Sequence, residues 1–188
     1  MKLLSLRPAL AGLSLVALMA ATRMHHFGSA LHLPDASLAV FLLAGVLVAS
    51  PLLFAVLLLE AGALDYVAIA HLGVSDWCVT PAYWFLIPTY AVLWYAGRHY
   101  ARIHRHSLRS LGMFAGLSVA ALSAAFLISN GSFYWFSGRY PDTSVAEYLA
   151  RVAQYYVPYL SGGLLYLGCA AALYAVLAAR APAAAKAE

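Results

Sequence analysis

Six hydrophobic stretches constrain this chain more than any other feature of its sequence. The chain has 188 residues, of which 64% are hydrophobic and only 10% are charged, whereas a soluble domain carries about 25% charged residues. Apolar runs of roughly 20 residues are typical of membrane helices, because a helix satisfies its own backbone hydrogen bonds in lipid. We therefore predict an all-α integral membrane protein, a six-transmembrane-helix bundle that forms a single domain over residues 1–188. Its predicted helices cover residues 8–22, 36–49, 51–72, 81–100, 108–129 and 144–179.

Residues at the ends of these stretches favour helix boundaries there. Asp35 and Ser144 are candidate N-caps, and Pro51 and Pro81 suit the first turn of a helix. Pro158, with two glycines shortly after it, is a candidate kink or break in the last stretch.

The distribution of charge predicts the orientation of the bundle. With both termini in the cytoplasm, eight of the 11 Lys and Arg residues fall on the inner side, and only Arg23, Arg139 and Arg151 fall outside. Six of the seven acidic residues fall in, or toward, the outer half. Because positively charged loops stay on the cytoplasmic side, we predict a multi-pass protein with cytoplasmic termini and an even number of spans.

A cluster of arginines and histidines lies at residues 98–106, between the fourth and fifth stretches. A metal site is one interpretation of its histidines, but the interspersed arginines would repel a cation. We interpret the cluster as a cytoplasmic anchor that rests on anionic lipid. These loops account for the net charge of +4, so the charge gives no reason to expect a nucleic-acid partner.

Ionisable and aromatic residues gather on the predicted outer side. Most of the Tyr and Trp residues there suit an ordinary membrane-interface belt. Asp65 differs, because it lies inside an apolar stretch, where a charge requires a cavity or a partner. Arg151, near the start of the last stretch, is a candidate partner. Glu60 lies nearer the middle of the membrane, and we interpret it as a protonated core residue outside the site.

The segment 73–84 places a thiol among aromatic rings at a break between two hydrophobic runs. Cys78 follows Asp76 and Trp77 and precedes a predicted helix start, whose dipole favours a thiolate. Cys78 has three alternative roles: it fills space, coordinates a metal or acts as a nucleophile. One thiolate is too few ligands for a zinc site built by protein alone, but it suffices as an axial ligand to a metal held by a macrocycle. Cys169, inside an apolar run, suits an inert buried role.

Together these features resemble BtuM, the cobalamin-binding S-component group of energy-coupling-factor transporters. The resemblance covers essentially the whole chain: a small size, six hydrophobic helices and a loop after the third helix that contains Trp and Cys. His25 and His26 are adjacent, so the sequence leaves open which of these two histidines belongs to the site. The residues that match the family's binding residues in type and relative spacing are His26, Asp65, Cys78, Tyr83 and Arg151.

The resemblance implies an S-component-like bundle in the bacterial cytoplasmic membrane that takes up cobalamin (vitamin B12) through a site facing outside. Cobalamin would be the bound substrate, without an intrinsic cofactor, and Cys78 would ligate the corrin cobalt in place of the nucleotide base. The other four residues would hydrogen-bond the corrin amides or set the environment of the thiol. The family also implies slow reductive removal of cyanide from cyanocobalamin. S-components dock to an energy-coupling module, a transmembrane protein with ATPases, and whether this chain needs one stays open.

Three alternatives to a vitamin-binding transport component stay open from the sequence. A membrane enzyme would use Cys78 as the nucleophile, with His26 or His71 as its base. A heme or metal-ion permease would require ligands along a path across the membrane, but the middles of most stretches contain no ionisable side chain. A purely structural subunit would have no need for acidic residues collected on one side.

Overall fold

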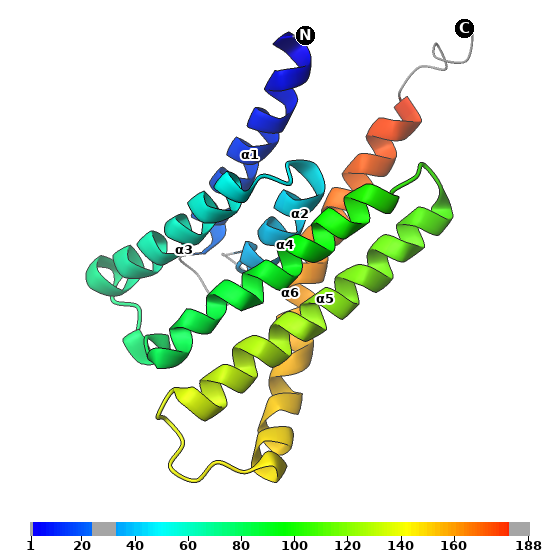
Figure 1. Cartoon of the computed structure of the whole chain (residues 1–188). Helices are drawn as coiled ribbons and strands as arrows, with labels where there is room; N and C mark the ends of the chain where they lie inside the picture. Colours follow the sequence, from blue (N-terminus) through cyan, green and yellow to red (C-terminus); the bar gives the residue numbers. More distant parts are fainter. Residues whose placement is uncertain (1, 24–32, 181–188) are drawn as a thin grey trace, which may run out of the picture.

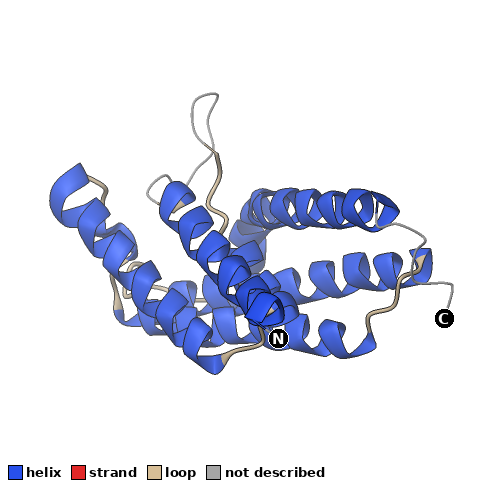
Figure 2. Cartoon of the chain, turned by 90° about the horizontal axis from the view of Figure 1, so that it is seen from above, coloured by secondary structure: helices blue, strands red, loops and turns tan. Residues whose placement is uncertain are grey.

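The computed structural model describes residues 2–23 and 33–180, and within these ranges it contains helices and loops but no strand (Figure 2). The prediction of an all-helical protein is confirmed. The elements, in chain order, are α1 (Lys2–Thr22), α2 (Ser37–Leu47), α3 (Pro51–Leu72), the 3₁₀ helices η1 (Asp76–Cys78) and η2 (Pro81–Phe85), α4 (Leu86–Ile103), α5 (Leu108–Phe136) and α6 (Val145–Arg180).

Among the described residues, three helices, α3, α5 and α6, are long and apolar enough to cross a membrane. By contrast, α2 has only 11 residues, or about 16 Å at 1.5 Å per residue, which falls short of the roughly 30 Å hydrocarbon core of a bilayer. The structure therefore supports a membrane protein with three helices of spanning length.

The loops and helix ends separate into two ends of the bundle. Figure 1 shows the beginning of α1, the turn between α4 and α5 and the end of α6 in its upper part. The 3₁₀ helices η1 and η2 and the connection from α5 to α6 lie in its lower part. The arginine-rich cluster at 98–106 and the segment at 73–84 therefore lie at opposite ends.

The short helix α2 lies at the centre of the packing. Eight of its 11 residues are buried, because it is apolar on all sides and neighbouring helices cover it. The Phe41 ring stacks on the Tyr90 ring of α4, with 4.0 Å between the ring centroids. A stretch predicted to span the membrane therefore forms a buried core helix, and it holds α4 at a defined position.

The backbones of α2 and α4 touch at two glycines. A Cβ atom on Gly45 would lie 2.1 Å from the carbonyl oxygen of Trp94, and one on Gly97 would lie 2.0 Å from the carbonyl oxygen of Leu42. Because the obstructing atoms belong to the backbone, no side-chain rotation relieves the clash. Small residues allow this close approach of helices in membrane bundles.

We expect Gly97→Ala to reduce the free energy of unfolding by about 1–3 kcal/mol, because α2 and α4 must move apart to admit the methyl group. Unfolding in mixed detergent micelles measures this change. Gly112→Ala on α5 is the matched control, since nothing lies within 4 Å of its added Cβ. An equal loss in both variants would contradict the role of the glycine contact.

Several predicted helix limits differ from the structure; the first helix, for example, begins at Lys2 instead of residue 8. The fourth helix begins at Leu86 instead of residue 81, because Pro81–Phe85 forms the 3₁₀ helix η2. The fifth helix continues seven residues beyond 129, to Phe136. Polar residues end the apolar run there, but Gly131 and Ser132 are buried, so the helix remains packed. The sixth helix continues through Pro158 without a break.

The two predicted N-caps have different outcomes. Ser144 accepts a hydrogen bond from the N–H of Glu147 at 3.2 Å, which confirms it as the cap of α6. The N-cap of α2 is Ala36, which has no capping side chain. Asp35 lies one residue before Ala36, and its Oδ1 accepts a hydrogen bond from the N–H of Ser37, the first residue of α2, at 2.9 Å.

Candidate functional site

Asp65 of α3 forms a buried ion pair with Arg23, which directly follows α1. Arg23 Nε donates to Asp65 Oδ1 and Arg23 Nη2 donates to Asp65 Oδ2, each at 2.8 Å. Arg23 is 3% exposed and Asp65 8%. This two-pronged geometry is the strongest form of an Arg–carboxylate pair, and it satisfies the charge that the sequence places inside an apolar stretch.

Arg23 also joins α2 and α4 to this pair. Its Nη1 donates to Ser37 Oγ and to the hydroxyl oxygen of Tyr90, both at 2.8 Å, and its Nε also donates to the Ala61 carbonyl oxygen at 3.2 Å. Ser37 Oγ donates in turn to Asp35 Oδ1 at 2.6 Å. One guanidinium group therefore connects α1, α2, α3 and α4.

The network reaches the segment after η1 through Tyr83. The Tyr83 hydroxyl donates to Asp65 Oδ2 at 2.6 Å, so a residue of η2 is tied to the middle of α3. Burial, together with this hydrogen bond to a carboxylate, raises the pKa of Tyr83. Tyr83 therefore remains a neutral phenol and donates a hydrogen bond to the Asp65 carboxylate. Of the predicted site residues, Asp65 and Tyr83 are in direct contact.

Cys78 ends η1 and is exposed. Ser75 Oγ accepts from the N–H of Trp77 at 3.2 Å, and the Asp76 carbonyl oxygen accepts from the N–H of Val79 at 2.8 Å, so the turn is internally hydrogen-bonded. The chain leaves α3 just before this turn at Gly73, which caps the helix in the left-handed conformation with a φ of 71°.

The electrostatic surroundings of Cys78 differ from the sequence-based expectation. Partial burial by neighbouring atoms raises the pKa of the thiol, the carboxylate of Asp65 raises it further, and the guanidinium of Arg139 opposes them. The thiol is therefore protonated at neutral pH, and the prediction that a helix start favours a thiolate is wrong. A metal that binds this sulfur must displace its proton.

A depression of about 300 Å³ lies between α3 and the η1–η2 segment. Its volume falls at the lower end of the usual range for small-molecule sites. Asp76 and Val79, on both sides of Cys78 in the sequence, contribute to its wall. The residues that line it are Gly62, Asp65, Tyr66, Ile69, Asp76, Val79 and Tyr83.

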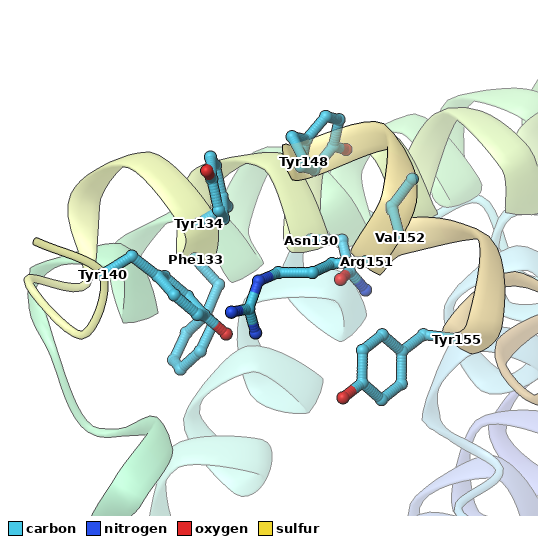
Figure 3. Close-up of a pocket in the computed structure, with 8 residues that line it drawn as sticks. All are labelled: Asn130, Phe133, Tyr134, Tyr140, Tyr148, Arg151, Val152 and Tyr155. Carbon is cyan, nitrogen blue, oxygen red and sulfur yellow. The ribbon is translucent and has the colours of Figure 1, made fainter. Parts of the chain in front are cut away.

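Arg151 is not the partner of Asp65, which corrects that prediction. Arg151 Nε donates to Glu147 Oε1 at 2.8 Å, on the exposed side of α6. Its guanidinium lies 5.1 Å from the centre of the Tyr140 ring, as Figure 3 shows. Arg23 takes the predicted place because α1 packs against α3, whereas Arg151 follows the connection from α5 to α6.

The small hollow around Arg151 is a separate feature. It has a volume of about 20 Å³, enough for a single water molecule. Aromatic rings form most of its wall (Figure 3). Its lining residues are Asn130, Phe133, Tyr134, Tyr140, Tyr148, Arg151, Val152 and Tyr155.

The remaining predicted residues give less information. His26 and its neighbour His25 lie outside the described residues. His71 is exposed near the end of α3, with its ring against Tyr66. Glu60 is partly buried, and its Oε2 has no hydrogen-bond partner among the described residues. Within residues 2–23 and 33–180, no group of three or more His, Cys, Asp or Glu side chains is placed to hold a metal ion.

Sequence reasoning missed two residues around the site. Arg23 was counted only as an outer charge, although a lone cation directly after an apolar helix signals a need for a partner. Arg139 was noted on the outer side but was not assigned to the site, and it contacts Trp77 beside Cys78. No local pattern indicates that second contact, because the two residues are 62 positions apart.

No known protein-family model matches the chain, and no curated protein matches its sequence. The resemblance to the cobalamin-binding S-components therefore depends on residue types and their spacing in the sequence alone, and it stays a prediction.

Proposed function

We propose that this chain is a membrane-embedded binding component for cobalamin uptake, with Cys78 as the axial ligand of the corrin cobalt. The observation that carries the proposal is an exposed thiol on the η1 turn, next in sequence to two residues that line a depression of about 300 Å³. Because four corrin nitrogens already hold the cobalt, the protein needs to supply only one soft ligand to it.

The surrounding groups suit recognition of a corrin, whose edge has amide groups. Asp65 and Tyr83 lie in the wall of the depression, and the ion pair with Arg23 holds Asp65 in place. Trp77 and Trp84 are 51% and 74% exposed, so their rings are accessible to the apolar edge of a macrocycle. Arg151 lies across the α5–α6 connection and would contact a more distant part of the ligand.

A corrin with its side chains is larger than this depression, so binding must widen it. The movable boundary is the η1–η2 segment, because its residues are more exposed than the helices behind it. The ligand would then select a more open arrangement of the same site. An energy-coupling module is the candidate membrane partner for release into the cell.

The test is the visible spectrum of the purified protein after addition of cobalamin. We expect a corrin absorption that remains with the protein and differs from that of free cobalamin, because sulfur replaces the nucleotide base. Cys78→Ala should remove this sulfur-dependent spectrum. Cys169→Ala is the matched control and should leave it unchanged, since this second exposed thiol lies in α6.

Two results would overturn the proposal. A protein that stays colourless at high cobalamin concentration does not bind the vitamin. A bound spectrum that is identical in the parent and in Cys78→Ala excludes the thiol as a ligand. A colourless parent that shows Cys78-dependent hydrolytic activity would support the alternative of a membrane enzyme.

A further inference from the structure

Arg139, on the connection between α5 and α6, contacts the turn that contains Cys78. Its guanidinium lies 4.3 Å from the centre of the Trp77 ring, and its Nη2 donates to the Trp77 carbonyl oxygen at 3.2 Å. Both the side chain and the backbone of the residue before Cys78 are therefore held by one arginine. A cation above a tryptophan ring is the most favourable of the cation–aromatic pairs.

The connection that presents Arg139 is itself ordered by specific contacts. Gly138 adopts a φ of 70°, a left-handed conformation that glycine adopts without strain, and it turns the chain at the end of α5. The N–H of Arg139 donates to Ser137 Oγ at 3.2 Å. The Tyr134 hydroxyl accepts from the N–H of Ser144 at 2.9 Å, so the two ends of the connection are joined.

The next residue, Tyr140, makes the corresponding contact on the other side. Its ring lies next to the guanidinium of Arg151, as Figure 3 shows, and its centre is 4.9 Å from that of the Tyr134 ring. Consecutive residues therefore connect η1 to the start of α6. Cys78 and Arg151, which do not contact each other, are joined through this short connection.

We propose that Arg139 is a positioning residue of the Cys78 site, which holds η1 through Trp77 and so keeps the thiol in place on this turn. The inference rests on the proposed function, because it assigns to Arg139 the placement of the atom that bonds cobalt. Arg139 itself does not contact the metal. Its loss leaves the parts of the wall formed by α3 and η2 in place but lets η1 move with its thiol, so formation of the sulfur–cobalt bond slows more than capture of the ligand weakens.

The first measurement uses the full chain without ligand. Hydrogen exchange reports the opening of η1 through the hydrogen-bonded N–H groups of Trp77 and Val79. In Arg139→Ala we expect exchange in residues 74–79 to be about two- to fivefold faster, the range for an exposed cation–aromatic contact. Arg139→Lys should restore part of the protection, because an ammonium group also lies favourably over the ring. Arg102→Ala, an exposed arginine at the opposite end, should change nothing.

The second measurement uses added cobalamin and separates affinity from rate. In Arg139→Ala we expect the rate of the spectral change at saturating cobalamin to fall about threefold or more, with the dissociation constant within about twofold of the parent. The rate of the spectral change in Arg139→Lys should lie between the rates of the parent and of Arg139→Ala. A purely structural role would instead lower affinity, rate and stability together.

The outcomes distinguish this inference from the proposed function. Unchanged exchange in Arg139→Ala overturns the positioning role, whether or not cobalamin binds. Faster exchange with equal rates at saturation also overturns it, because η1 would then be held without effect on the thiol. If the parent binds no cobalamin while exchange still responds to Arg139, the proposed function fails and the contact survives only as a structural one.

Discussion

Replacing Arg23 with methionine lowers the free energy of unfolding by about 3–5 kcal/mol, the usual cost of removing one partner from a buried ion pair. The substitution leaves the Asp65 carboxylate buried, with Tyr83 as its remaining hydrogen-bond donor among residues 2–23 and 33–180. It also removes the donors that satisfy Ser37 and Tyr90. Unfolding in mixed detergent micelles, followed by circular dichroism, measures the change.

The exposed pair of Arg151 and Glu147 supplies the control for Arg23. Arg151→Met should change the free energy of unfolding little, because the side chains of both Arg151 and Glu147 are in contact with solvent. The double variant Arg23→Met, Asp65→Leu should lose less than the sum of the two single variants, since it removes both charges of the buried pair and leaves only the more exposed Asp35 without its cation. Equal losses in Arg23→Met and Arg151→Met would show that burial of the pair contributes nothing.

If the proposed function holds, we expect Cys78→Ser to abolish removal of cyanide from cyanocobalamin while it weakens binding much less. Serine preserves the size of the side chain, so the depression keeps its shape, but a neutral hydroxyl is a poor donor to cobalt compared with a soft thiolate. We expect cyanide release to fall by about a hundredfold or more and affinity to fall by about tenfold or less. The rate is followed by visible spectroscopy, with a small-molecule reductant that supplies the electrons.

Cys169→Ser tests whether the loss is specific to the η1 thiol. It should retain the parent rate, because Cys169 lies on α6, which contributes no residue to the wall of the depression lined by Asp65 and Tyr83. Cyanide release at the parent rate in Cys78→Ser would refute the catalytic role of the sulfur. Equal loss of binding and of cyanide release would assign Cys78 to ligand capture alone.

Helix positions were predictable where the signal is local. The third helix occupies residues 51–72, as its apolar run predicts, and α5 begins at Leu108, directly after a serine cap. Such limits depend on neighbouring residues only: an apolar run long enough for a helix, a cap and a proline in the first turn. The end of α5 was predicted too early, because burial of Gly131 and Ser132 by another helix overrides their local preference.

The candidate site was predictable in its residue types but not in its pairing. Asp65 stands out in the sequence because a carboxylate inside an apolar stretch requires a partner. The identity of that partner depends on which helices pack together, and Arg23 is 42 positions away. The same holds for Arg139 and Trp77. Contacts of this range leave no periodic or local trace in the sequence.

The sequence by itself determined that this chain is helical and suited to a membrane, because apolar composition and run length decide how a backbone can be satisfied in lipid. It also marked Cys78 and Asp65 as chemically unusual. Only the tertiary structure decided that α2 is a buried core helix, that Arg23 neutralises Asp65, and that Arg139 holds the turn beside the thiol. Packing of distant segments sets those contacts, and packing is a property of the whole fold.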